Sequence, residues 1–305
     1  MKAVLLDADT LGDDIDLAPI REVVSELRVF GTTSPAQLAE HAGDADLLLT
    51  NKVQLGEAIM AGRKGLLVMA TGTNNVDLAA AKARGIPVLN VNNYGTASVA
   101  QHTLMLLLTL AAKLPLYQQE LTAGAWQQSP FFCLMGNKTL ELAGKTLVLV
   151  GSGTLGSEVA RLAEAFGMTV KFAARPGNAE DTRPSLDNLL SDADALSFHC
   201  PLTEQTRHLL NAERLAAIKP GCLVVNCARG GVIDELAALD ALKAGRLGGL
   251  AVDVLPVEPP REGHPLLDAL AEPLNLIVTP HSAWISPEAR QNIVNITANN
   301  IRSLL

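Results

Sequence analysis

The sequence predicts an α/β protein made of two Rossmann-like, doubly wound parallel-sheet domains. Short apolar runs alternate with helical patterns through nearly all of the 305 residues, which is typical of βαβ units. The chain is longer than the roughly 100–200 residues expected of one domain. Its hydrophobic fraction is 48% but its aromatic fraction only 3%. The cores must therefore be aliphatic, as they are in parallel sheets buried on both faces.

The first 95 residues predict five strands joined by amphipathic stretches. The strand candidates are residues 3–6, 27–30, 46–49, 66–69 and 88–91. One amphipathic stretch, residues 35–41, is predicted to be a helix. Ser34 is its expected N-cap, and Pro35 occupies its first helical position.

A long apolar helix, predicted at residues 97–114, precedes a second set of strands. A looser stretch follows the helix at residues 124–136 and contains several large aromatic side chains. Six further strands are expected, the number in a full dinucleotide-binding sheet, at residues 146–150, 169–172, 195–198, 223–226, 250–252 and 276–278. Residues 286–305 predict one final helix, with Ser286 as its cap and Pro287 at its start.

Charge and composition exclude several classes of partner. The net charge of −8 argues against binding to nucleic acid or to an anionic membrane. Asp7 and Asp9 interrupt the N-terminal apolar run, and the longest apolar stretch, 104–112, is about half of the roughly 20 residues that span a bilayer. The sequence has four cysteines, Cys133, Cys200, Cys222 and Cys227. They form no CxxC motif and show no metal-like spacing with histidine. We expect a cytoplasmic protein with reduced thiols and no metal site.

A glycine motif lies between a predicted strand and a predicted helix. Residues 147–150 lead directly into Gly151-Ser152-Gly153-Thr154-Leu155-Gly156, and this context makes the pattern informative. Gly151 permits a tight turn, Gly153 lets the backbone approach a pyrophosphate, and Gly156 lets helix and strand pack closely. Free N–H groups at the start of the helix would hold the phosphates. Thr154 and Leu155 are therefore also expected to contact the cofactor.

The end of the next strand indicates which dinucleotide binds. A site specific for NAD normally has Asp or Glu there, to bind the ribose 2′-hydroxyl. Here Ala174 occupies the position and Arg175 follows. Because a guanidinium attracts a 2′-phosphate, we expect NADP(H) to be preferred, with NAD(H) possible. The alternative is that Arg175 is a solvated turn residue and both cofactors are accepted.

Three later segments each follow a predicted strand and contain one candidate catalytic residue. They are 224–231 with Arg229, 251–259 with Glu258, and 278–284 with His281. In open α/β sheets ligands bind at the carboxyl ends of strands, so these side chains should converge near the nicotinamide. A histidine suits proton transfer near neutral pH, and arginine suits a carboxylate.

These segments resemble the D-isomer-specific 2-hydroxyacid dehydrogenase family, in its glycerate dehydrogenase or hydroxypyruvate/glyoxylate reductase branch. The glycine motif and residues 70–77, 94–100 and 199–203 also resemble the family, and the resemblance covers essentially the whole chain. It implies reversible NAD(P)H-dependent reduction of a small 2-keto acid, hydroxypyruvate or glyoxylate before pyruvate. Alternatives are a D-lactate-type or broad 2-ketoacid reductase and, outside enzymes, an NAD(H)-sensing, corepressor-like binding protein.

The resemblance also implies roles for individual residues. Arg229 would bind the substrate carboxylate and carbonyl oxygen, His281 would give and take the proton, and Glu258 would orient His281. The N–H groups of Thr71 and Gly72 would hold the substrate carboxylate. Asn51 is a further, less secure match on the substrate side. The remaining implied cofactor contacts are Thr96, Cys200, Pro201, Thr206, Cys227, Ala228 and, at the nicotinamide, Asp253.

The resemblance further implies a discontinuous organisation. A flavodoxin-like substrate domain, residues 1–95 plus 285–305, would surround an inserted dinucleotide-binding domain, residues 96–284. Closure about the two crossings would expel water during hydride transfer. The family is usually homodimeric through the 97–135 region. The apolar helix and Trp126, Phe131 and Phe132 are consistent with such an interface, and a loop near 126–133 would reach the partner's site.

Overall fold

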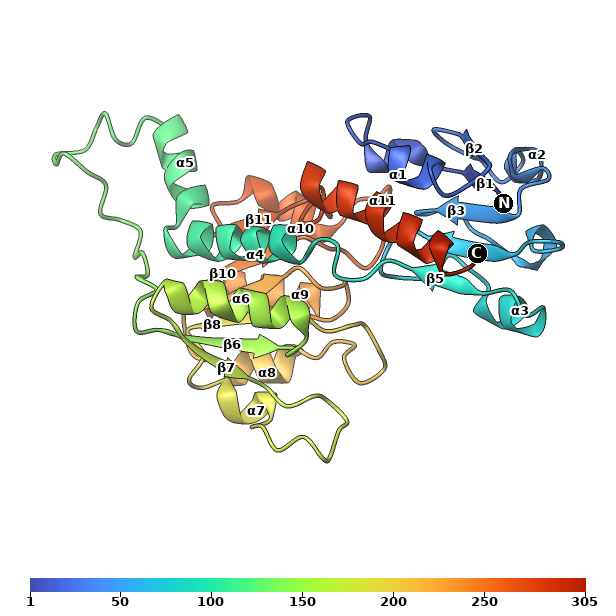
Figure 1. Cartoon of the computed structure of the whole chain (residues 1–305). Helices are drawn as coiled ribbons and strands as arrows, with labels where there is room; N and C mark the ends of the chain where they lie inside the picture. Colours follow the sequence, from blue (N-terminus) through green and yellow to red (C-terminus); the bar gives the residue numbers. More distant parts are fainter. The chain divides into compact units, whose positions relative to one another are not determined.

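The structure, a computed structural model, describes residues 1–305 and divides into two compact units. Unit 1 comprises Met1–Thr96 and Trp284–Leu305, and unit 2 comprises Ala97–Ala283. Each unit contains one parallel sheet with helices packed on it (Figure 1). The predicted fold class, two doubly wound α/β domains, is confirmed.

The sheet of unit 1 has the strand order β2-β1-β3-β4-β5, with every pair parallel. Its strands are β1 (Lys2–Leu5), β2 (Glu26–Val29), β3 (Leu47–Thr50), β4 (Gly65–Val68) and β5 (Val88–Asn90). Each agrees with its predicted range to within one residue. The order reverses between β1 and β3, and ligands of doubly wound folds bind at the carboxyl ends of strands beside such a switch point.

Helices cover both faces of this sheet. They are α1 (Ala18–Arg21), α2 (Leu38–Ala42), α3 (Leu78–Ala83) and α11 (Pro287–Arg302), with short 3-10 turns η1 (Ala8–Leu11) and η2 (Glu57–Ile59). Successive strand residues point to opposite faces. Leu5 and Leu49 therefore pack with α1 and α11, whereas Val4 and Leu48 pack with α2 and α3. The aliphatic composition thus forms two buried layers.

The start of α2 differs from the prediction. The helix begins at Leu38, with Gln37 rather than Ser34 at its N-cap position. The Ser34 hydroxyl lies 2.7 Å from Gln37 Oε1, and the Ser34 N–H donates to the same oxygen at 3.2 Å. Because the hydroxyl is bonded to a side chain, it does not cap the first turn, and residues 35–37 form a turn before the helix.

The last helix, α11, begins as predicted. Ser286 Oγ accepts from the N–H of Ala289 at 3.2 Å, and Pro287 occupies the first turn. Arg290 pairs with Asp14, with Nη2 2.9 Å from Oδ2. The helix contributes four fully buried side chains to the core of unit 1: Ile293, Val294, Ala298 and Ile301.

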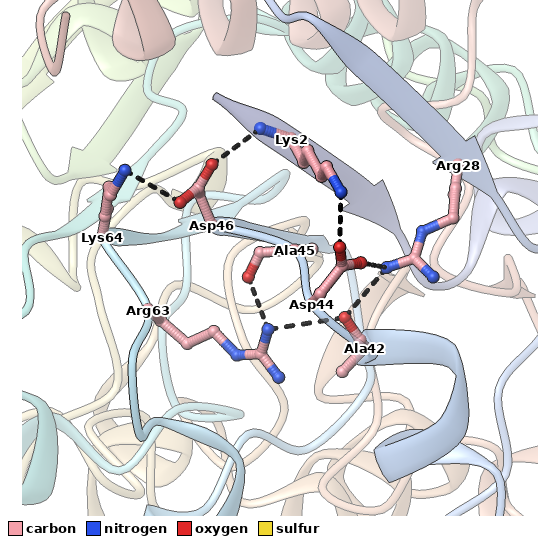
Figure 2. A network of polar contacts seen from close by, with 8 residues as sticks. All are labelled: Lys2, Arg28, Ala42, Asp44, Ala45, Asp46, Arg63 and Lys64. Carbon is pink, nitrogen blue, oxygen red and sulfur yellow. Dashed lines mark hydrogen bonds and ion pairs between the residues drawn. The ribbon is translucent and has the colours of Figure 1, made fainter.

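A network of charged side chains joins the amino ends of the unit 1 strands (Figure 2). Asp44 pairs with Lys2 and, at 3.4 Å, with Arg28. Asp46 accepts from the Lys2 N–H at 2.8 Å and pairs with Lys64 at 2.9 Å. Hydrogen bonds from Lys2 and from Lys64 lower the pKa values of Asp44 and Asp46, respectively. These pairs are largely exposed and contribute little to stability. They lie at the opposite end of the sheet from the strands' carboxyl ends.

The sheet of unit 2 has the strand order β11-β10-β9-β8-β6-β7, again entirely parallel. The strands are β6 (Thr146–Val150), β7 (Thr169–Phe172), β8 (Ala195–Phe198), β9 (Cys222–Asn226), β10 (Leu247–Val252) and β11 (Leu276–Val278). All six predicted strands are present, although β9 and β10 begin earlier than predicted. The order reverses between β6 and β8, which places the switch point beside the glycine motif.

Both faces of this sheet are also buried. On one face, α4 (Thr96–Ala111) and α6 (Thr154–Ala165) cover Leu147, Leu149 and Val225. On the other, Val148 and Val224 belong to the layer covered by four shorter helices. These helices are α7 (Leu186–Leu189), α8 (Ala212–Ala217), α9 (Glu235–Lys243) and α10 (Pro265–Asp268).

The apolar helix predicted at 97–114 is in fact two helices. α4 ends at Ala111, Lys113 adopts a left-handed conformation with φ 56°, and α5 (Leu114–Thr122) continues after a bend of 57°. Pro115, in the first turn of α5, has no N–H to continue the α4 ladder. By length and composition no single helix could cross a membrane, and only α4 and α5 taken together reach that threshold.

Candidate active site

The glycine motif follows β6 at the switch point of unit 2. Gly151 has φ 112°, and a Cβ there would overlap the carbonyl oxygen of His199. A Cβ at Gly156 would overlap the carbonyl oxygen of Gly151, whereas a Cβ at Gly153 would have no atom within 4 Å. The first N–H groups of α6, at residues 154–156, donate to no acceptor in the protein. Open space and free donors at a helix start fit a dinucleotide pyrophosphate.

The loop after β7 leaves a positive charge free. The Ala174 N–H donates to Pro184 O at 2.8 Å, which closes the loop. Asp181 accepts from the Arg175 N–H at 2.7 Å and from Arg183 Nε at 2.8 Å. The hydrogen bond from Arg183 and, to a smaller extent, that from the Arg175 N–H hold the pKa of Asp181 well below its ordinary value. The Arg175 side chain is exposed and forms no hydrogen bond or ion pair.

The turn that contains Arg229 is held by two buried side chains. Asn226, at the end of β9, donates from Nδ2 to Arg229 O and accepts from the Ala228 N–H, both at 3.0 Å. Glu235 is only 5% exposed, and its Oε1 accepts from the Gly231 N–H at 2.7 Å. Arg229 itself is exposed and donates from Nη1 to Ala228 O. The backbone is therefore fixed, while other guanidinium N–H groups remain available.

His281 and Glu258 form a direct pair. His281 Nδ1 lies 2.6 Å from Glu258 Oε2, and the side chains are 35% and 32% exposed. Glu258 Oε1 accepts from the Leu255 N–H at 2.8 Å. Because an ionised carboxylate only accepts hydrogen bonds, Nδ1 is the donor. The other ring nitrogen, Nε2, is then the atom that can exchange a proton with a substrate.

Asp253 lies beneath the turn that contains His281. Its side chain is 1% exposed. Oδ1 accepts from Thr279 Oγ1 at 2.5 Å and from the Ser282 N–H at 2.9 Å, and Oδ2 accepts from the Ala283 N–H at 3.1 Å. The Asp253 carbonyl accepts from the His281 N–H at 2.7 Å. The carboxylate therefore accepts hydrogen bonds from Thr279, Ser282 and Ala283. Its expected place at the nicotinamide side of the cofactor stays a prediction.

Gly230 lets the Arg229 turn pack directly on the segment that leads to Glu258. A Cβ at Gly230 would overlap the backbone of Leu255 and of Pro256. Arg229, Glu258 and His281 follow β9, β10 and β11, which are neighbours in the sheet. The structure therefore places all three predicted catalytic residues at the carboxyl edge of unit 2.

The other predicted cofactor contacts of unit 2 lie on loops after β8 and β9. Thr206 is 5% exposed, accepts from the Thr203 N–H and donates to Pro201 O, both at 2.7 Å. Its side chain therefore stabilises the 200–206 loop from inside. Burial raises the pKa of Cys200 to about 11. The two residues after β9, Cys227 and Ala228, are each only 7% exposed.

In unit 1, a buried aspartate holds the turn after β3. Asp7 is 4% exposed. Its carboxylate accepts from the N–H groups of Asn51 at 2.9 Å, Lys52 at 2.6 Å and Val53 at 3.1 Å. The Asn51 side chain donates to Thr10 Oγ1 at 3.0 Å. Because Asp7 follows β1 and Asn51 follows β3, this cluster lies at the switch point of the unit 1 sheet.

Of the remaining predicted residues of unit 1, two lie on a loop and one begins a helix. Thr71 and Gly72 follow β4, and their N–H groups donate to no acceptor in the protein. Asn90 Nδ2 donates to Thr71 O at 2.7 Å, which orders this loop. Thr96 begins α4 and donates from Oγ1 to Asn93 O at 3.2 Å.

A doubly wound unit with this glycine loop and an Arg, Glu and His set at its carboxyl edge defines a nicotinamide-dependent oxidoreductase. The model for the NAD binding domain of D-isomer specific 2-hydroxyacid dehydrogenases matches residues 104–283. The chain belongs to this family, and the predicted family and enzyme class are confirmed. Its cofactor is a pyridine nucleotide, and its substrate is a small hydroxy or keto acid.

The similarity to known proteins extends over the whole chain. Glycerate dehydrogenase of Methylorubrum extorquens is 36% identical, with 100% of this chain and 96% of the relative covered. Hydroxypyruvate reductase of Blautia hydrogenotrophica is 34% identical, with coverage of 100% and 97%. The structure of a D-2-hydroxyisocaproate dehydrogenase has a TM-score of 0.86 at 25% identity, with coverage of 99% and 96%.

Sequence reasoning missed the residues that hold these loops in place: Asp7, Asn226, Glu235 and Thr279. Asp7 and Asn226 had a usable signal, since each is a polar residue at the carboxyl end of a buried strand. Glu235 and Thr279 had none, because a single acidic or hydroxyl residue near a loop is common on protein surfaces.

Proposed function

We propose that the chain reduces hydroxypyruvate or glyoxylate with a reduced nicotinamide cofactor, that the reaction is reversible, and that NADPH is preferred. The glycerate dehydrogenase and hydroxypyruvate reductase named above support this substrate class. The observation that carries the proposal is the 2.6 Å pair of His281 and Glu258 beside the exposed Arg229.

In this proposal His281 is the acid and base of the reaction. A bound reduced nicotinamide supplies the hydride. His281 Nε2 gives its proton to the carbonyl oxygen of the keto acid and takes one back in the reverse direction. Glu258 holds Nδ1 and so fixes the plane of the ring. Arg229 binds the carboxylate and the carbonyl oxygen with its planar, permanently charged donors.

Unit 1 would supply the remaining substrate contacts. Two neighbouring N–H groups without acceptors, on Thr71 and Gly72, suit a carboxylate, because an unpaired backbone donor gains a charge-assisted hydrogen bond. Asn51 is the proposed third contact. Its backbone is held by Asp7, so its side chain starts from a fixed position.

The proposed cofactor contacts are the N–H groups of residues 151–156, the loops at 200–206 and 227–228, Thr96 and, at the nicotinamide side, Asp253. NADPH preference rests on the end of β7. Arg175 is exposed and unpaired there, and the nearby carboxylate of Asp181 already accepts hydrogen bonds from Arg183 and from the Arg175 N–H. The free charge beside a ribose 2′-position is therefore positive, which favours a phosphate over a hydroxyl.

We also propose a homodimer through α4, α5 and the segment that follows. This region exposes large apolar side chains, and such side chains are enriched at the centres of interfaces. They are Met105, Leu108, Leu114, Leu121, Trp126, Phe131, Phe132 and Met135. Phe132 is 91% exposed, which is unusual for a phenylalanine without a partner.

The test follows absorbance at 340 nm with NADPH or NADH over a panel of 2-keto acids. Hydroxypyruvate and glyoxylate should be turned over faster than pyruvate, and His281→Ala should lower kcat by about 100-fold or more. His208→Asn is the matched control, because His208 pairs only at 3.9 Å with Asp234. Near-normal kcat in His281→Ala would contradict the mechanism. Cofactor binding without turnover of any keto acid would favour a sensor instead.

A further inference from the structure

The turn that contains His281 is hydrogen-bonded to the first part of α4. Ser98 Oγ donates to Ala283 O at 2.7 Å. His102 Nε2 lies 3.0 Å from Thr279 Oγ1. These contacts lie on the two sides of His281, at positions 279 and 283, so one helix holds both ends of the turn.

The hydrogen bonds that link His102 to Asp253 through Thr279 have a defined direction. Thr279 has one hydroxyl proton, and it donates this proton to Asp253 Oδ1 at 2.5 Å, because an ionised carboxylate only accepts. Thr279 Oγ1 must then accept from His102, so His102 carries its proton on Nε2. Asp253 in turn accepts from the N–H groups of Ser282 and Ala283. We refer to His102, Thr279 and Asp253 as the His102 network.

His102 and Asp253, at the two ends of the His102 network, are largely buried. The side chain of His102 is 15% exposed and that of Asp253 is 1% exposed. Burial lowers the pKa of His102, and the charge of Asp253, 3.5 Å away, opposes this shift. The buried thiol of Cys227 is the other titratable group that interacts with this carboxylate. Hydrogen bonds in such surroundings are strong, and a missing one is costly.

His281 needs this support because its backbone is in an unfavourable region. Its φ is 53°, a left-handed conformation that few residues other than glycine adopt. Such a conformation persists only where neighbouring contacts determine it. The His281 N–H donates to Asp253 O, and the two residues that follow donate to the Asp253 carboxylate.

We propose that His102 is a positioning residue, which holds His281 in the orientation for proton transfer through Thr279 and Asp253. The inference rests on the acid–base role of His281 in the proposed function. His102 does not reach the reacting atoms and is not itself catalytic. Its helix begins at Thr96, where the chain leaves unit 1, and Ala283 is the last residue before the chain returns. The contacts of α4 therefore join the His281 turn to both crossings of the chain.

The test replaces Thr279 by valine, which removes the hydroxyl but keeps the branched shape. Thr279→Val should lower kcat by about tenfold to a hundredfold, because small displacements of a reacting group are costly. KM for NADPH should change less than about twofold, since the glycine loop is untouched. The solvent deuterium isotope effect on kcat should increase, because proton transfer becomes slower. Thr279→Ser keeps the hydroxyl and should therefore retain a kcat close to that of the wild type. The matched control is Thr109→Val on α4, where the hydroxyl bonds only to its own helix.

Two further variants keep the test decisive if Thr279→Val does not fold. His102→Leu and Ser98→Ala each remove one hydrogen bond between α4 and the His281 turn, and they should lower kcat with the same increase in the isotope effect. Wild-type kcat in these variants would overturn the inference, as would a lower melting temperature with unchanged kcat and isotope effect. If His281→Ala is inactive while Thr279→Val is normal, only this inference fails. If His281→Ala is normal, the proposed function fails.

Discussion

Gly230→Ala should separate the Arg229 turn from the segment that leads to Glu258. The added Cβ would lie under 3.0 Å from backbone atoms of both Leu255 and Pro256, where ordinary contact begins at 3.4 Å. Backbone cannot rotate away as a side chain can, so the two segments must move apart by a large fraction of an ångström. A displacement of roughly 1 Å among reacting groups costs about 100-fold in rate. Overpacking of this kind costs about 1–3 kcal/mol of stability.

The assay measures kcat/KM and the melting temperature of the same preparations. A loss of 1 kcal/mol should lower the melting temperature by roughly 2–4 °C for a unit of this size. Gly136→Ala is the control in unit 2, because a Cβ there meets only Glu120 Oε1 at 3.9 Å. If Gly230→Ala retained kcat/KM within about twofold and melted with the wild type, the close approach would not matter and the reasoning would be refuted.

Three other outcomes follow from charge and burial. Arg175→Ala should raise KM for NADPH by about tenfold and leave KM for NADH nearly unchanged; Arg161→Ala on α6 is the control, and an equal loss with both cofactors would contradict the proposal. Burial lowers the pKa of His199 from 6.5 to about 4, so its stability contribution is complete above pH 6.5 and is lost as the pH falls toward 4. Urea midpoints of wild type and His199→Asn should therefore converge on acidification, and parallel curves would count against this. At pH 7.5 iodoacetamide should label Cys133 first, since burial raises the pKa of the other three thiols; peptide mass spectrometry reads the order.

The alternation of apolar runs was sufficient to locate every strand. The aliphatic strands of unit 2 illustrate why, since buried parallel strands are short, continuous and bounded by polar or glycine residues. Helix starts were harder. Ser286 caps α11 as predicted, but Ser34 does not cap α2, because the Gln37 side chain binds its hydroxyl. Both serines precede a proline, so the local sequence does not distinguish them.

For the site, sequence and resemblance identified residues that follow strands, and the structure brings Arg229, Glu258 and His281 to one edge of a sheet. Neither the sequence nor the resemblance revealed which contacts hold the loops of the site in place. The bond from His102 to Thr279 spans 177 positions, and no local pattern relates two residues so far apart. Asp253 was predicted from the resemblance to the family, but its burial depends on the turn packed over it, which only the folded chain shows.

The discontinuity of unit 1 has a consequence for biosynthesis. Its sheet is translated first, yet α11, which covers one face, follows after all of residues 97–283. At about 5–20 residues per second, roughly 10–40 s pass between them. During that interval Leu5, Leu47 and Leu49 lack the helix that buries them, so the nascent chain presents an apolar sheet face to solvent or to a chaperone. Unit 2 can fold in the meantime, so unit 1 buries this face of its sheet only after α11 has been synthesised.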